Sequence, residues 1–509
     1  MVWSLETSRG YEVRKVRDRI SPYLDGYILD VGCGDEKVCP GAIGVDNEGK
    51  VANIRMDLSD PKAFRLFGDG SMDVVFSSHF LEHVYDFKST LREFWRMIKP
   101  DGALILYLPH KDLYPRMGEN GANPDHKHDF EPEDILSAMR ETSKLFTVER
   151  NEIRQDGDEY SFELILRKGE MIETPKTREK PVIVVRYGAF GDMVISAPVY
   201  RLLKEAGHYV IANCSDESAF VLDGNPYIDE VILQGRTTIP LTQLDPYFAS
   251  LREQYQAPLI NLCESLERTL LIDKETDPHL WALSKEERHK LCNVNYSEFA
   301  LQKAGFTGGA KPELYLTETE EILAKLFCRQ HEGYFKLMWQ CSGSSWHKLP
   351  PFTSDVVDEF LETYPDMRVF LTGGENVSMI DWNHPRLMSR LRNKWGPRQS
   401  MVLTKYMDCV VSPETGILNA AGAFDTPKIG LLTHSSKENL TKHWVNDYSI
   451  ESTAPCAPCH KMIYYIEDCP VDKEFGLPIC MSEHMDVEKI KENIRTIYNK
   501  WKGAKHGRD

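Results

Sequence analysis

The sequence predicts an α/β protein built from three Rossmann-like units. Short apolar runs alternate with helical patterns within residues 27–168, again from residue 181 and once more from about residue 337. This is the pattern of parallel strands joined by crossover helices. The chain has 509 residues, enough for several cores at roughly 100–200 residues each. Its 41% apolar and 27% charged residues are typical of globular proteins and exclude global disorder.

Charge and hydropathy exclude other classes of protein. The formal net charge is −17, which argues against diffuse binding of nucleic acid or of an anionic membrane. The longest apolar runs, such as residues 103–108, have the length of a strand, whereas a membrane span needs roughly 18–20 residues. The N-terminal residues lack the apolar stretch of a signal peptide. We therefore expect a cytoplasmic protein without a membrane span.

The first unit is expected over residues 1–168. Its main helix is predicted from about Asp86 to Ile98, and its last two runs alternate every second residue, as neighbouring strands do. The predicted strands are residues 27–33, 42–46, 72–78, 103–109, 146–154 and 160–168. Residues 169–180 are charged, contain Pro175 and lack apolar periodicity, which is typical of an inter-domain linker.

Residues 181–335 and 336–509 are predicted to form two further lobes that face a cleft. The first lobe opens with a strand, a glycine loop and a helix in PVIVVRYGAFGDMVISAPVYRLLKEAG. The second restarts with KLMWQCSGSS and ends in a helix from about Val487 to Trp501. Two successive doubly wound halves are typical of a protein that binds its ligands between the lobes.

The first candidate site lies at the strand ends of the first unit. Glycines in Asp30-Val-Gly-Cys-Gly34 follow a strand directly, which lets a ligand approach the backbone. Asp46 ends the next strand, where an acidic residue can accept the hydroxyl groups of a ribose. Asp57 follows at the position where an adenine edge would lie.

This stretch resembles the class I S-adenosylmethionine-dependent methyltransferases. The resemblance covers about residues 23–168 and is carried by DVGCG, GSMDVVFSSHFLEHV and LREFWRMIKPDGALILYLP. It implies that S-adenosylmethionine binds here, with Ser77, Ser78 and His79 below the transferred methyl group. The implied cofactor-binding residues are Asp30, Gly32, Gly34, Asp46, Asp57, Leu58 and Ser78.

One departure concerns the first crossover. Only ten residues separate Gly34 from Val45, whereas a crossover with a helix needs about a dozen or more. We therefore expect a loop there in place of a helix. The alternative interpretation is a non-catalytic, methyltransferase-like scaffold domain.

The acceptor side of this site is expected in the segment LPHKDLYPRMGENGANPDHKHDF. Methyl transfer to an oxygen needs an aligned acceptor and a base, and His110 is the predicted base. Other polar side chains of the segment are Tyr114, Arg116, His126, His128 and Asp129. The last three also form a possible set of metal ligands.

The second candidate site combines loops of the two lobes. Asp192 stands at the start of a helix, whose N-terminus stabilises an ionised carboxylate; an ordinary helix cap is the alternative. In the second lobe, SGSSWHKLPPF, LTGGEN and SPETGILNAAG each follow a strand and suit a phosphate or a nucleoside. They supply the predicted donor-binding residues Ser344, Lys348, Gly373, Gly374, Glu375, Glu414, Thr415 and Gly416.

These stretches resemble the ADP-heptose lipopolysaccharide heptosyltransferase family, glycosyltransferase family 9, with the two-lobe GT-B fold. The resemblance spans about residues 181–485 and implies an inverting, metal-independent transfer from a nucleotide-sugar. Asp192 would be the general base, Lys348 would neutralise the leaving diphosphate, and the acceptor would bind in the lobe 181–335. The family usually has DTG and a helix with a histidine, whereas this chain has Glu414 and Asn419, so ADP-heptose is not assumed.

A cysteine cluster follows the second lobe. Cys456, Cys459, Cys469 and Cys480, with His460 beside them, offer enough soft ligands for a tetrahedral structural zinc. Reduced or locally bridged thiols are the alternative, since a single CxxC is less specific than two.

The resulting prediction is a bifunctional enzyme. It would transfer a sugar to a glycan or conjugate acceptor and methylate the same product or a pathway intermediate. A rival is a glycosyltransferase that acts on a modified nucleic-acid base, as some phage enzymes do; the net charge does not favour it. A third interpretation is an active glycosyltransferase beside the scaffold domain described above.

Overall fold

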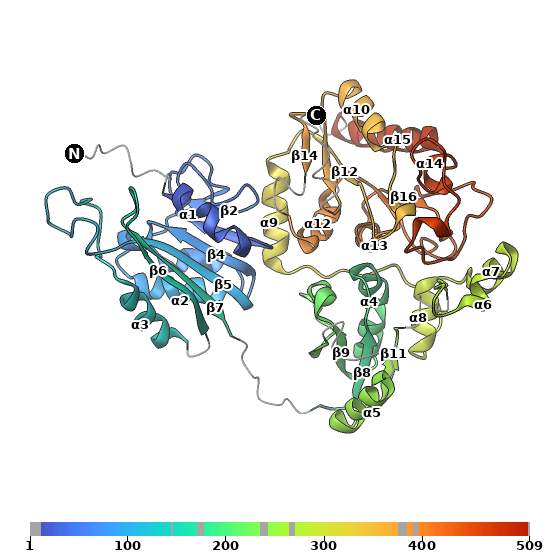
Figure 1. Cartoon of the computed structure of the whole chain (residues 1–509), viewed down its shortest axis with the longest axis horizontal. Coiled ribbons are helices and arrows are strands. Elements are labelled where there is room, and N and C mark those ends of the chain that lie inside the picture. The colour runs from blue at the N-terminus through green and yellow to red at the C-terminus, as the bar shows by residue number, and fades with distance from the viewer. Residues whose placement is uncertain are drawn as a thin grey trace. The chain divides into compact units, whose positions relative to one another are not determined.

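The computed structural model (Figure 1) describes residues 12–143, 146–169, 178–234, 243–263, 270–374, 384–389 and 395–506. The chain divides into two compact units. Unit 1 comprises residues 1–175 with 318–326 and 392–399, and unit 2 comprises residues 176–317, 327–391 and 400–509. Most of the predicted linker 169–180 lies outside the described residues.

Unit 1 contains a seven-stranded sheet in the order β3-β2-β1-β4-β5-β7-β6. The strands β1 to β5 are parallel, and β7 lies antiparallel between β5 and β6. This is the doubly wound order closed by an antiparallel pair, as predicted. The strands are β1 Ile28–Val31, β2 Ile43–Asp46, β3 Ile54–Arg55, β4 Met72–Ser78, β5 Ile98–Pro109, β6 Phe146–Arg154 and β7 Ser161–Lys168.

Two apolar cores cover the two faces of this sheet, because side chains alternate along each strand. Val75, Leu104 and Leu106 belong to the core beneath α2 and α3, whereas Phe76 and Ile105 belong to the core beneath α1 (Figure 1). The helices are α1 Val13–Ile20, α2 Phe87–Met97 and α3 Pro132–Thr142. The crossover between β1 and β2 is a loop without a helix, as predicted.

A distant segment completes unit 1. Residues 318–326, the first part of α9 (Glu318–Arg329), group with it. Leu323 lies in the same core as α2 and α3, and the Thr319 hydroxyl accepts a hydrogen bond of 2.9 Å from the Gly68 amide. The sequence analysis assigned this segment to the lobe 181–335, and no local pattern signals its packing.

The first sheet of unit 2 has four parallel strands in the order β10-β9-β8-β11. It is followed by short helices before the second sheet begins. The strands are β8 Pro181–Arg186, β9 Tyr209–Ser215, β10 Glu230–Gln234 and β11 Leu259–Asn261. The helices are α4 Phe190–Glu205, α5 Leu244–Tyr255, α6 Pro278–Trp281, α7 Lys285–Cys292 and α8 Tyr296–Lys303.

The second sheet of unit 2 has six parallel strands in the order β14-β13-β12-β15-β16-β17. Three sheets with parallel strands at their centres confirm the predicted fold class. The strands are β12 Phe335–Gln340, β13 Met367–Thr372, β14 Leu387–Ser389, β15 Cys409–Pro413, β16 Lys428–Leu432 and β17 Ile450–Glu451. The helices are α10 Thr353–Thr363, α12 Pro397–Leu403, α13 Gly416–Ala423, α14 Ile479–Ser482 and α15 Val487–His506.

Within the described ranges, no helix combines the length and the apolar character that crossing a membrane requires.

The packing of Leu323 can be tested by hydrogen exchange. We expect Leu323→Ala to leave a cavity that destabilises unit 1 by about 2–5 kcal/mol, and therefore to speed amide exchange in β4 and β5. Lys325→Ala, an exposed position on the same helix, is the matched control and should leave exchange unchanged. Equal protection of β4 and β5 in the two variants would contradict this assignment.

Candidate functional sites

The strand ends of unit 1 surround a cavity of about 720 Å³. All seven residues that the sequence analysis assigned to the cofactor line it. They are Asp30, Gly32, Gly34, Asp46, Asp57, Leu58 and Ser78. The remaining lining includes Phe80, Tyr114 and Tyr160, so the cavity combines polar groups with aromatic walls, as small-molecule sites do.

Asp30 is a buried carboxyl at the end of β1. Its Oδ2 accepts a hydrogen bond of 2.6 Å from the Val38 amide. Burial raises the pKa of Asp30 to about 7, while this hydrogen bond and the positive charge of Lys37 act in the opposite direction. The carboxyl thus ties the loop after β1 to the strand end.

Asp46 joins the loops that follow β1 and β2. Its Oδ2 accepts a hydrogen bond of 2.9 Å from the Gly34 amide, and its Oδ1 accepts bonds of 2.9 and 2.7 Å from the amides of Glu48 and Gly49. Gly34 has a φ of +54° and Gly32 one of +73°, a region that favours glycine. The glycine pattern therefore serves the backbone path as well as ligand access.

The floor of the cavity is formed by the residues that follow β4. The Ser78 hydroxyl is buried without a hydrogen-bond partner. His79 has a φ of +48°, and its Nε2 lies 2.9 Å from the Ser161 hydroxyl. Burial lowers the pKa of His79 to about 3, so its ring is neutral at pH 7.

The structure corrects the expectation for His110. This residue is buried at the end of β5, and its Nδ1 accepts a hydrogen bond from the Asp112 amide. It packs against Phe162 and is absent from the described lining of the cavity. The histidines that do line the cavity are His79, His83 and His126.

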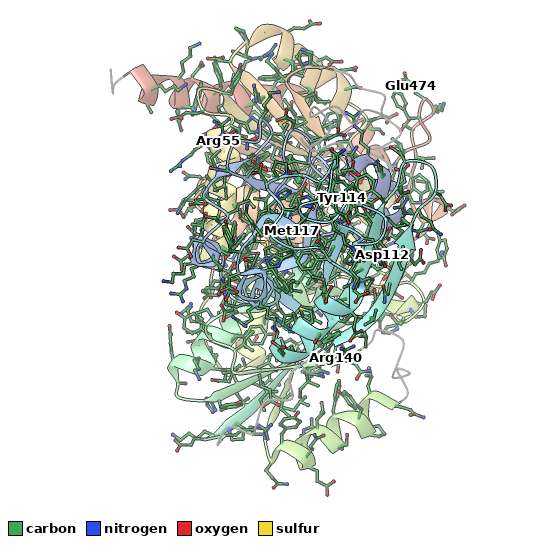
Figure 2. The ribbon with its side chains drawn as sticks, turned by 90° about the vertical axis from the view of Figure 1, so that its left-hand side faces the viewer. Arg55, Asp112, Tyr114, Met117, Arg140 and Glu474 are labelled. Atoms are coloured by element: carbon green, nitrogen blue, oxygen red, sulfur yellow. The ribbon has the colours of Figure 1, made fainter. Side chains whose placement is uncertain are left out.

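The predicted metal ligands His126, His128 and Asp129 have different partners in the structure. His126 lines the cavity, but His128 Nε2 lies 2.9 Å from the Val84 carbonyl. The carboxylate of Asp129 accepts hydrogen bonds from the Met117 amide, at the far side of the same segment. Asp112, Tyr114 and Met117 of that segment are labelled in Figure 2. The set His126, His128 and Asp129 is therefore not assembled.

Instead, Glu82, His83 and His126 come together on one wall of the cavity. Burial raises the pKa of Glu82 to about 8 and lowers the pKa of His126 to about 4. Glu82 and His83 belong to the motif SSHFLEH, which by itself predicts no role for either residue. Their spacing of one residue and the distance of His126 along the chain offered no signal of a cluster.

In unit 2, the N-termini of α4 and α13 meet. A Cβ on Gly191 would lie 3.0 Å from the Gly416 Cα, and a Cβ on Gly416 would overlap the Phe190 ring. Both positions therefore require glycine. The amide groups at the start of each helix carry partial positive charge. The junction of the two helices therefore favours an anionic group.

Asp192 lies in the first turn of α4 beside the end of β8. Its Oδ2 is 3.1 Å from Nη2 of Arg186, a fully buried side chain, while Asp192 itself remains 21% exposed. Arg186 thus holds an accessible carboxylate in place. The sequence analysis quoted Arg186 in its motif but did not predict this contact.

The loops of the second lobe gather near this carboxylate. A Cβ on Gly343 would lie 2.7 Å from the Lys348 side chain and 3.1 Å from Thr415, so the loops after β12 and β15 are in close contact. The Ser342 hydroxyl accepts a hydrogen bond of 3.1 Å from the Gly374 amide, which adds the loop after β13. Ser344 is exposed, and Glu375 lies outside the described residues.

Lys348 lies between two acids. Burial lowers the pKa of its ammonium group, while the charges of Glu414 and Asp192 act to raise it. Glu414 is buried, and its carboxylate accepts hydrogen bonds of 3.1 and 2.8 Å from the amides of Thr433 and Ser435. It also forms an ion pair of 2.9 Å with His434. Glu414 therefore holds its own loop through these contacts, and the donor contacts of Glu414, Thr415 and Gly416 stay predictions.

The cysteine cluster consists of neighbouring free thiols. The charges of Cys456 and Cys469 both act on Cys459, and burial raises the pKa of the Cys459 thiol to about 12. Among the described residues, the groups of three or more ligand atoms within 4.8 Å of one another do not include these cysteines. The structural zinc stays a prediction.

Comparison with known families concerns unit 1 first. Residues 5–147 match the family model of a methyltransferase domain. The chain contains a methyltransferase domain. A structure of an S-adenosylmethionine-dependent methyltransferase from Mesorhizobium loti is similar with 17% identity and a TM-score of 0.26, over 31% of this chain and 99% of that one.

Two solved glycosyltransferases are similar over a longer part of the chain. A glycosyl transferase of family 9 from Veillonella parvula has 12% identity and a TM-score of 0.46, with 64% of this chain and 99% of that chain covered. ADP-heptose lipopolysaccharide heptosyltransferase II from E. coli has 14% identity and a TM-score of 0.41, with 63% and 99% covered. A comparison with curated proteins found no match.

The close contact between α4 and α13 predicts how substitutions there change the stability of unit 2. We expect Gly416→Ala to cost about 1–3 kcal/mol in the free energy of unfolding of unit 2, because the added methyl group overlaps the Phe190 ring. Adding Phe190→Ala should remove part of that cost, so the two changes should be non-additive in urea denaturation. Gly503→Ala, with no atom within 4 Å of its Cβ, is the control. Strict additivity would show that the ring and the methyl group do not meet.

Proposed function

We propose that the cavity of unit 1 binds S-adenosylmethionine and that the methyltransferase domain is active. The observation that carries this proposal is the convergence of all seven predicted cofactor residues on one cavity. Glycines at two strand ends allow close approach, and acids after β1 and β2 suit the amino and hydroxyl groups of such a cofactor. The neutral histidines of the same cavity supply hydrogen-bond acceptors on the opposite side.

The reaction we infer is transfer of the sulfonium methyl group to an acceptor hydroxyl. The acceptor oxygen forms a bond to the methyl carbon as the bond from carbon to sulfur breaks, and S-adenosylhomocysteine leaves. The hydroxyl proton passes to a base on the cavity wall. His79 is the candidate for this role because its ring lines the cavity and its Nε2 lies 2.9 Å from the Ser161 hydroxyl.

For unit 2 we propose sugar transfer from a nucleotide-sugar donor with inversion. The helix N-termini at Asp192 and Gly416 support it, since one presents a carboxylate and the other presents free amides. Asp192 would take the proton of the acceptor hydroxyl as its oxygen attacks the anomeric carbon. The bond from that carbon to the diphosphate breaks, and Lys348 neutralises the nucleoside diphosphate that leaves.

The two activities together define the proposed protein. It would add a sugar to a glycan or conjugate and methylate the same product or a pathway intermediate, because two sites on one chain raise the local concentration of a shared intermediate. The twelve cysteines are all free thiols, which supports a reducing compartment such as the cytoplasm. We retain zinc at Cys456, Cys459, Cys469 and Cys480 as a proposal.

The first test concerns the cofactor. We expect S-adenosylmethionine to bind the full chain in a calorimetric titration and Asp46→Ala to weaken binding about tenfold to a hundredfold, because hydrogen bonds to a charged group contribute about 1.5–3 kcal/mol. Asp69→Ala, an exposed acid of the same unit, should bind like the parent. No binding by parent and variants alike would favour the scaffold interpretation.

The second test concerns the base of sugar transfer. We expect Asp192→Asn to lower product formation about 10²–10⁴-fold while nucleoside diphosphates still bind. Products would be measured by mass spectrometry with a panel of ADP-, UDP- and GDP-sugars and glycan acceptors. Lys348→Ala serves as the contrasting variant, since it should weaken diphosphate binding itself. Near-normal turnover of Asp192→Asn with any donor that the parent uses would remove Asp192 as the base.

A further inference from the structure

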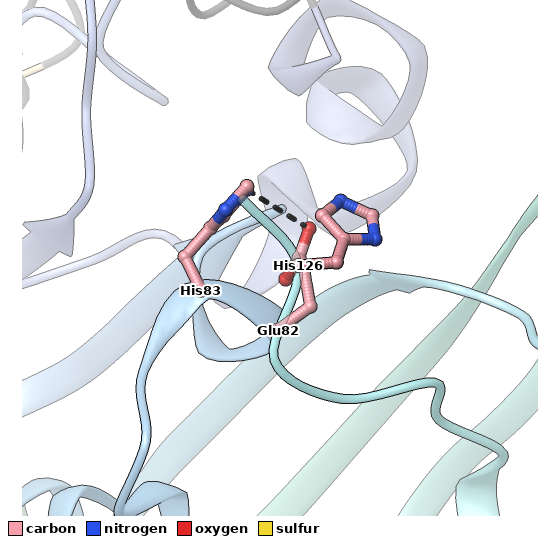
Figure 3. A group of neighbouring side chains, drawn as sticks. All are labelled: Glu82, His83 and His126. Carbon is pink, nitrogen blue, oxygen red and sulfur yellow. Dashed lines mark ion pairs between the residues drawn. The ribbon is translucent and has the colours of Figure 1, made fainter. Parts of the chain in front are cut away.

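The cluster formed by Glu82, His83 and His126 has the geometry of a metal site. One ligand atom from each residue lies within 4.8 Å of the other two. His83 Nε2 is 3.9 Å from Glu82 Oε1, and the rings of His83 and His126 are 4.8 Å apart between centroids. Figure 3 shows the carboxylate of Glu82 between the two rings.

Backbone hydrogen bonds hold these three residues together. Glu82 and His83 lie in one short turn, Leu81–His83. The Glu82 carbonyl accepts hydrogen bonds of 2.6 and 3.3 Å from the amides of Lys127 and His128, which fixes the segment of His126 against that turn. The cluster is therefore built by the fold, and it does not depend on the chance position of long side chains.

The carboxyl group of Glu82 makes no hydrogen bond to any residue that the structure describes. Its side chain is fully buried, and both of its oxygens lack a hydrogen-bond partner. His79 Nδ1, at 3.7 Å from Oε1, is the nearest further nitrogen recorded. Burying a carboxyl group without a hydrogen bond costs several kcal/mol, and a bound cation would offset this cost.

We propose that Glu82, His83 and His126 bind a divalent transition-metal ion on the acceptor side of the methyltransferase cavity. Two imidazoles and one carboxylate form the ligand set of many zinc and non-haem iron sites, and three protein ligands leave coordination positions open. The adjacent residues His128 and Asp129 are bonded to backbone groups and are excluded from the set.

The position of the metal site in this cavity suggests that the methyl acceptor fills the open coordination positions. This inference rests on the proposed methyl transfer. The cluster shares the cavity with Ser78 and Asp46. A metal ion with open positions can hold two neighbouring hydroxyl groups of a sugar and lower the pKa of one of them. It would thereby orient and activate the oxygen that accepts the methyl group.

The experiment uses the full chain and zinc as the probe. Protein freed of metal with a chelator is dialysed against Zn²⁺, and bound zinc is measured by mass spectrometry of the metal. We expect His126→Ala and Glu82→Gln each to bind one zinc fewer per chain than the parent. His128→Ala is the matched control and should bind as much as the parent. Equal zinc content in His126→Ala, Glu82→Gln and the parent would overturn the proposal.

A second series of variants distinguishes zinc at the proposed site from zinc bound elsewhere in the chain. Cys456→Ser reports any zinc at the cysteine cluster, and combining it with His126→Ala should lower the zinc content additively if both sites exist. Folding of each variant is checked by circular dichroism, and binding of S-adenosylhomocysteine is measured separately. If His126→Ala does not fold, His83→Gln replaces it with the same expected loss. Zinc loss with intact S-adenosylhomocysteine binding supports the metal site. Absence of S-adenosylhomocysteine binding in the parent contradicts the proposed methyl transfer alone, because the zinc measurement is independent of it.

Discussion

The parallel pairing of β1 with both β2 and β4 determines where the functional groups of unit 1 gather. Val31 lies opposite Val45 on one side and opposite Ser77 on the other, so the three strands end at the same edge of the sheet. Every residue that follows these strands must then turn over that edge. Asp30 and Asp46 lie at the ends of β1 and β2, and Gly32 and Gly34 follow β1 directly, so all four line the cavity; a shift of register by one residue would scatter them.

The same constraint operates in the second sheet of unit 2. There β12 is the central strand, with Gln340 opposite Thr372 and Trp339 opposite Val411. The three loops that follow β12, β13 and β15 consequently meet, as the contacts of Gly343 with Thr415 and of Ser342 with Gly374 show. The same topological rule therefore brings the loops at strand ends together in both sheets.

Local patterns in the sequence sufficed for the parts of the sites that follow strands directly. Glycines and acids at strand ends identified Asp30, Asp46 and Asp57, because their placement depends only on strand position. Contacts between distant segments could not be read in this way. The packing of Leu323 into unit 1 links residues some 250 positions apart, and no periodicity encodes it.

The histidines of unit 1 also show that local sequence patterns do not predict contacts between distant segments. His110 was a reasonable candidate because it follows a central strand, yet the ring is buried against Phe162 and bonded to the Asp112 amide. His126 reaches the cavity instead, because the Glu82 carbonyl pairs with the backbone just beyond it. Which of several histidines in a polar loop faces a ligand is decided by such backbone pairing, and composition carries no record of it.

The distribution of charge in the cavity supports a division between its two ends. Asp46, Asp57 and Glu82 all line the cavity, and in the proposed arrangement the first two lie at the cofactor end and Glu82 lies at the acceptor end. In the proposed reaction, acids at the cofactor end would favour the positively charged sulfonium over the neutral thioether that remains after transfer, so the product would be released more easily than the substrate. An acid at the acceptor end would instead repel an ionising hydroxyl group. A cation bound at Glu82, as proposed, would reverse that sign and stabilise the ionising hydroxyl group, whereas the acids at the other end would act on cofactor binding and product release.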